Sequence, residues 1–132
     1  MTEADLAFRG LLALLATCAV VAILFYPTWI VLHKVLSKKL DGYIFKEPYF
    51  SRSEMINYRS FPLSLVKSIN YIYLVAFPRW AKRKRFQALN EDLPVGNMLT
   101  IVCQLHFSLG LVGLVLFFIL FIYLGITVLL YA

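Results

Sequence analysis

Ionisable residues of the kinds that serve catalysis are scarce in this chain of 132 residues, which has seven Asp and Glu and two His. Residues 11–32 and 109–132 contain no charged residue at all. A proton relay or an ion-coupled carrier needs ionisable groups at membrane depth, so these stretches argue against both functions. The remainder contains no Ser/His/Asp set, glycine-rich phosphate loop or nucleophile elbow. We therefore predict that the protein is not an enzyme and binds no cofactor.

Cysteine is equally rare, since Cys18 and Cys103 are the two present and no CxxC motif occurs. Two cysteines do not make a disulfide framework. Cys103 and His106 share one helix face, but a metal site needs three or four ligands and the other histidine is His33. We predict no metal site. An interhelical metal or haem site using His33 and His106 is an alternative to a polar face packed against another helix.

Apolar residues, by contrast, make up 61% of the chain, whereas soluble domains average about 45–50%. A helix needs roughly 20 apolar residues to cross a bilayer. Residues 11–32 and 109–131 meet this length. They predict an all-α membrane protein with two transmembrane helices.

The basic residues lie almost entirely between the two spans. Twelve of the 13 Lys and Arg fall between His33 and Pro94, and the thirteenth is Arg9. Because loops rich in Lys and Arg stay in the cytoplasm, the loop is predicted to be cytoplasmic and both termini to face outward. For a bacterial inner membrane, the termini would be periplasmic.

Local signals divide the chain into three segments, 1–40, 41–93 and 94–132. Thr2 and Asp5 form a possible capping box at the start of the first helix. Asp41-Gly42 is a turn signal, so we expect this helix to end near Leu40. Glu91-Asp92-Leu93-Pro94 is a break before a long final helix that carries the second span.

The loop itself contains two predicted helices. Ser51 and Glu54 form a second capping box, which predicts a short helix through Tyr58. Ser60 is expected to cap a helix over 62–77 that Pro78 ends. Its expected apolar face is Leu65, Val66, Ile69, Ile72, Tyr73, Ala76 and Phe77, and its expected polar side is Lys67, Ser68, Asn70 and Tyr71. We interpret it as an amphipathic interfacial helix; docking on a partner or on other loop helices, and a re-entrant hairpin, are the alternatives.

A run of five cations follows this helix. Anionic lipids attract such clusters, so we expect the loop to contact acidic headgroups or a partner through this run. The alternatives are that the run only sets the topology, that it forms a specific headgroup site, or that it binds an acidic protein surface. Because the run lies so close to two spans, we predict no nucleic-acid partner. The expected contact residues are Arg79, Trp80, Lys82, Arg83, Lys84 and Arg85.

Small residues in the spans predict close helix packing. Gly110 and Gly113 open a groove on the second span. The first span offers alanines spaced by three, and Ala19 is the expected counterpart of Gly113; the stripe is Ala13, Ala16, Ala19 and Ala22. The groove serves either an internal hairpin or the docking of a partner subunit.

The layout of two spans around a basic segment resembles universal stress protein B, a family of small bacterial inner-membrane proteins linked to stress responses. The local matches are Tyr49-Phe50-Ser51 and Tyr71-Ile72-Tyr73. The chain departs from the family in its longer loop, in Pro62 and Pro78, and in the basic run at 79–85. The resemblance implies no enzymatic activity and transfers no functional residue.

Because the sequence contains no catalytic motif, this layout predicts a non-enzymatic accessory or regulatory protein. It would pack its spans against a larger membrane complex or against itself, with its basic loop on anionic lipid. A homo-oligomeric pore or small transport component is the alternative. The lack of polar residues along either span weighs against that alternative.

Overall fold

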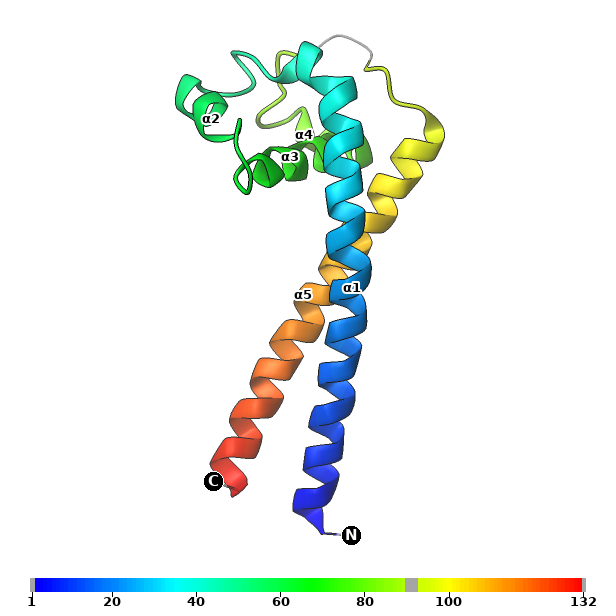
Figure 1. The fold of residues 1–132 in the computed structure, drawn as a ribbon, viewed down its shortest axis with the longest axis vertical. Helices are drawn as coiled ribbons and strands as arrows, with labels where there is room; N and C mark the ends of the chain where they lie inside the picture. Colours follow the sequence, from blue (N-terminus) through cyan, green and yellow to red (C-terminus); the bar gives the residue numbers. More distant parts are fainter. Residues whose placement is uncertain (1, 90–92, 132) are drawn as a thin grey trace. The chain divides into compact units, whose positions relative to one another are not determined.

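The computed structural model describes residues 2–89 and 93–131, and the regular secondary structure of these residues is all helical (Figure 1). The elements are α1 (Glu3–Ile44), α2 (Arg52–Asn57), α3 (Ser64–Ala76), α4 (Pro78–Ala81) and α5 (Asn97–Tyr131). α1 and α5 are each long and apolar enough to cross a membrane, and their most apolar windows bury no residue. The core helix of a soluble protein would instead be mostly covered. The all-helical class with two candidate spans is therefore confirmed.

The chain forms two compact units. The hairpin unit consists of the described residues up to Tyr26 and from Ser108 onward. The loop unit is Pro27–Phe107 and contains the end of α1, the three short helices and the start of α5.

α1 begins as predicted but continues further than predicted. The Asp5 backbone N–H donates to Thr2 Oγ1 (3.2 Å), and the Thr2 N–H donates to Asp5 Oδ2 (3.1 Å), which is the expected capping box. The helix then runs through Asp41-Gly42 to Ile44, so the predicted end near Leu40 is wrong. Packing explains the difference: Leu36, Leu40 and Ile44 are spaced by four and are fully buried. Burying this stripe outweighs the local turn preference.

A cluster of aromatic side chains lies at the centre of the loop unit. Phe50 is fully buried. Four other rings have centroids 5.5–6.2 Å from its own, mostly edge-on, a favourable geometry for aromatic pairs; they belong to Phe45, Tyr58, Tyr71 and Phe86. The loop unit therefore has a hydrophobic core of its own.

The short helices follow the local signals in part. The capping box of Ser51 and Glu54 opens α2 as predicted. α3 ends before Pro78, also as predicted, but it starts at Ser64 without a side-chain cap, so the role expected for Ser60 is wrong. α5 begins at Asn97, later than expected from Pro94. Of the predicted break before it, Glu91 and Asp92 lie outside the described residues.

The orientation of α3 is the main departure from expectation. Its polar side chains face the protein: Lys67 and Ser68 are buried. Val66 and Ile69, on the apolar face expected to lie against lipid, are 38% and 48% exposed, whereas Ile72 and Ala76 of the same face are buried in the protein. The inward side of α3 therefore combines polar and apolar residues. In Figure 1, α2, α3 and α4 gather beside the cyan part of α1, which supplies the polar groups that α3 meets.

Candidate functional site

A partly buried ion pair joins α3 to α1. Lys67 Nζ lies 3.0 Å from Asp41 Oδ1 and 3.2 Å from Oδ2, and Tyr71 donates its hydroxyl to Asp41 Oδ1 at 2.7 Å. The Lys67 side chain is 6% exposed and that of Asp41 is 41% exposed. Burial raises the pKa of Tyr71 well above its ordinary value, helped by its bond to Asp41 and the charge of that carboxylate. Tyr71 therefore keeps its proton and remains a donor to Asp41.

Two further sets of contacts anchor α3 beside both long helices. Ser68 hydrogen-bonds the ring of His33 on α1, and Ser37 lies 3.4 Å from the same nitrogen. On α5, Gln104 donates to the Ala76 carbonyl at 3.1 Å, and the ring of Phe107 packs edge-on against Phe77, 5.1 Å between centroids. His33 directly follows the first predicted span, and Phe107 lies two residues before the second. Within the loop unit, α3 thus bridges α1 and α5 at this level.

The basic run divides into two parts with different surroundings. The exposed part consists of Arg79, Trp80, Lys82, Arg83 and Lys84. Arg85 instead pairs with Glu54 (2.9 Å), donates to the Tyr49 carbonyl (3.1 Å) and lies 4.9 Å from the centre of the Phe50 ring. The hydrogen bond from Arg85 lowers the pKa of Glu54 to about 2. Among the predicted contact residues, Arg85 is therefore the one held inside the loop unit.

The two glycines of the second span are covered from the same chain, within the hairpin unit. A Cβ at Gly110 would lie 3.0 Å from the Phe25 ring, and one at Gly113 would lie 3.1 Å from Val21 Cγ1. Ala19, the expected counterpart of Gly113, is exposed. Residues spaced by three rotate about 60° per step around a helix, so the alanine stripe cannot stay on one face. Of the two interpretations left open, this arrangement corresponds to the internal hairpin.

A contact near the chain ends was not anticipated from the sequence. Tyr123 donates its hydroxyl to the Ala7 carbonyl at 2.8 Å. A Cβ at Gly10 would lie 2.5 Å from the same hydroxyl oxygen, so a larger residue here would displace the Tyr123 hydroxyl. A tyrosine within an apolar span is the one signal that could have pointed to this contact, because its hydroxyl must find an acceptor.

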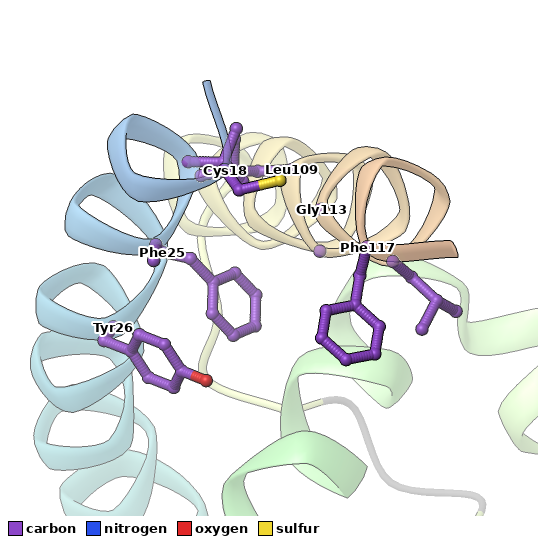
Figure 2. A pocket seen from close by; sticks show the side chains of 10 residues that line it. Cys18, Phe25, Tyr26, Leu109, Gly113 and Phe117 are labelled. Carbon is purple, nitrogen blue, oxygen red and sulfur yellow. The ribbon is translucent and has the colours of Figure 1, made fainter. Parts of the chain in front are cut away.

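A groove of about 370 Å³ lies between α1 and α5 in the hairpin unit. Figure 2 shows Phe25 from α1 and Phe117 from α5 projecting into it, with Cys18 directed toward α5. The lining is apolar apart from the Cys18 thiol and the Tyr26 hydroxyl. This chemistry suits a hydrocarbon environment and offers no acid or base.

Side chains that could bind a metal ion are not clustered among the described residues. Within 2–89 and 93–131, no three His, Cys, Asp or Glu side chains gather to hold a metal ion. Cys103 and His106 are buried on the side of α5 that packs into the loop unit. No family model, curated protein or solved structure matches the chain.

Proposed function

We propose that the chain is a non-enzymatic two-span protein of the bacterial inner membrane, with its loop unit on the cytoplasmic leaflet and both termini in the periplasm. It serves as an accessory or regulatory subunit of a larger membrane complex, or it associates with other copies of itself. The resemblance to universal stress protein B supports a stress-related setting. The chain performs no reaction of its own under this proposal.

The outward face of α3 carries this proposal. Leu63, Val66 and Ile69 are exposed on it. Asn70, the polar residue beside them, turns its amide back onto the Val66 carbonyl at 3.2 Å. Exposed apolar side chains such as Val66 and Ile69 are unfavourable in water, whereas they are stable where lipid covers them. The contacts of α3 with His33 and Phe107 agree with a position at the membrane boundary.

The surfaces of the spans favour helix packing over conduction. Large apolar side chains are exposed along both long helices, including Ile23 on α1 and Phe118 on α5. The hydroxyls of Thr17 and Thr127 donate to carbonyls four residues earlier in their own helices, at 2.9 Å each, so their hydrogens are already used. A pore or small transport component, the second candidate, would need a polar lining. These features support docking against other apolar helices.

Gentle-detergent purification combined with site-specific photo-crosslinking tests the proposal. A crosslinking residue at Phe118, on the exposed side of α5, should capture one larger partner protein in stoichiometric amounts. The same residue at Cys18, which faces α5 within the hairpin unit, is the matched control and should capture little. A closed ring of identical chains would support the pore instead. A lone monomer in native membranes, with no crosslinks from either site, would contradict the accessory function.

A further inference from the structure

Three exposed cations lie in α4 and in the turn that follows it. Arg79, Lys82 and Arg83 have the spacing of neighbours on a helix surface. The Lys82 N–H donates to the Pro78 carbonyl at 3.0 Å and the Arg83 N–H to the Trp80 carbonyl at 3.2 Å, so a tight turn follows α4 directly. No carboxylate of residues 2–89 or 93–131 pairs with these three side chains; Glu91 and Asp92 lie outside that part of the chain. Among the described residues, these cations therefore have no carboxylate partner.

An apolar shelf adjoins these cations. The Trp80 ring is stacked on Phe77, 5.7 Å between centroids and 22° between planes, and Trp80 is 58% exposed. A hollow of about 240 Å³ is lined by Ala76, Phe77, Pro78, Arg79 and Trp80. Phe77 also touches Phe107, which lies two residues before the second predicted span. Tryptophan favours the interface between headgroups and hydrocarbon, so the shelf suits that depth.

We propose that Arg79, Lys82 and Arg83 bind the phosphate of an anionic phospholipid whose glycerol and upper acyl chain lie against Phe77 and Trp80. The inference rests on the proposed location of the loop unit at the cytoplasmic leaflet. Charge complementarity selects an anionic headgroup, and the guanidinium of Arg79 can hold two phosphate oxygens at once. An acidic protein segment would leave the apolar shelf uncovered, whereas a phospholipid fills both parts.

Quenching of Trp80 fluorescence by brominated lipid tests this site. The full chain, with Trp29→Phe so that Trp80 is the only tryptophan, is reconstituted in phosphatidylcholine vesicles with a minor fraction of phosphatidylglycerol. The bromine is carried by phosphatidylglycerol in one sample and by phosphatidylcholine in the other. Phosphatidylglycerol should quench Trp80 in excess of its share of the lipid. Arg79→Gln should reduce this preference roughly fivefold, the effect expected for one cation at an anionic surface. Arg59→Gln, an exposed residue before α3, removes the same charge and should leave the preference unchanged.

The outcomes separate the lipid site from the proposed function. Absence of quenching by either lipid would place Trp80 outside the membrane and overturn both. Equal quenching per lipid molecule, or an Arg79→Lys variant with the lipid preference of wild type, would contradict a specific phosphate site. Either result would indicate only a general electrostatic attraction between the cations and anionic lipid. Inorganic phosphate should not compete, and loss of the preference in its presence would indicate a site for free phosphate. Retention of the preference in phosphate, with loss in Arg79→Gln alone, supports the phospholipid site.

Discussion

At the scale of residues, Lys67 is a buried cation that depends on one carboxylate. We expect Asp41→Asn to lower the free energy of unfolding by about 3 kcal/mol, the lower end for a broken buried pair, because Asp41 is partly exposed. Thermal unfolding in detergent measures this change. Adding Lys67→Met should restore most of the stability, since an apolar side chain needs no partner. Glu47→Gln, an exposed site of the same charge, is the control, and an equal loss there would contradict the role of the pair.

The pair of Glu54 and Arg85 predicts a dependence of stability on pH. The pKa of Glu54 falls from its ordinary 4.5 to about 2 in the folded protein. A lowered pKa means that the contribution of Glu54 is fully present above pH 4.5 and is lost as the pH falls toward 2. Unfolding midpoints measured across this window should drop less in Glu54→Gln than in wild type. Parallel curves would show that the pair does not contribute.

At the scale of elements, the orientation of α3 predicts a pattern of chemical labelling. In a background of Cys18→Ser and Cys103→Ala, a cysteine at Ile69 should react with an apolar, membrane-permeant maleimide and resist a charged one. A cysteine at Ser68 should resist both reagents, because that side of α3 packs on α1. Arg59→Cys should react readily with the charged reagent. Equal reaction of Ile69→Cys and Arg59→Cys with the charged reagent would mean that water covers the outer face of α3.

The glycines of the long helices offer a matched series. Gly113→Leu and Gly10→Leu should separate α1 from α5, because even a Cβ there would crowd Val21 or Tyr123. Gly125→Leu should be tolerated, since nothing lies within 4 Å of a Cβ at that site. Crosslinking of Cys18 to a cysteine at Leu114 with a short bifunctional reagent reports the separation. Undiminished crosslinking in Gly113→Leu would contradict the internal hairpin.

Sequence reasoning succeeded where the signal is local. Long apolar runs predict both candidate spans, and the capping boxes at Thr2 and Ser51 depend on residues three apart. The periodicity of α3 does not predict which of its residues face inward, because the structure buries Lys67 and Ser68 of the expected polar side together with Ile72 of the expected apolar face. That choice depends on His33 and Asp41, which lie far away in the sequence. The packing of Gly110 and Gly113 on the first span was one of two interpretations, but Val21 and Phe25 as the contacting residues were not predicted, because an apolar helix offers several faces that are chemically alike.

At the scale of the whole molecule, the distribution of charge predicts the topology. Reporter fusions at Ala132 should report the periplasm and insertions near Asn90 the cytoplasm; both positions lie outside the described residues. Moving the cations of the basic run to the N-terminus should weaken this orientation, because Lys and Arg hold their flank in the cytoplasm. Fusions that report the opposite sides would contradict the proposed location of the loop unit.

The bridging position of α3 also sets an order of events during synthesis. Its partners His33 and Asp41 precede it, so these contacts can form as soon as α3 leaves the ribosome. Gln104, which bonds Ala76, is translated 28 residues later. During that interval α3 has its polar side matched on α1 while the side that meets α5 is still open. The nascent chain can therefore complete the loop unit only once the ribosome has begun the second long helix.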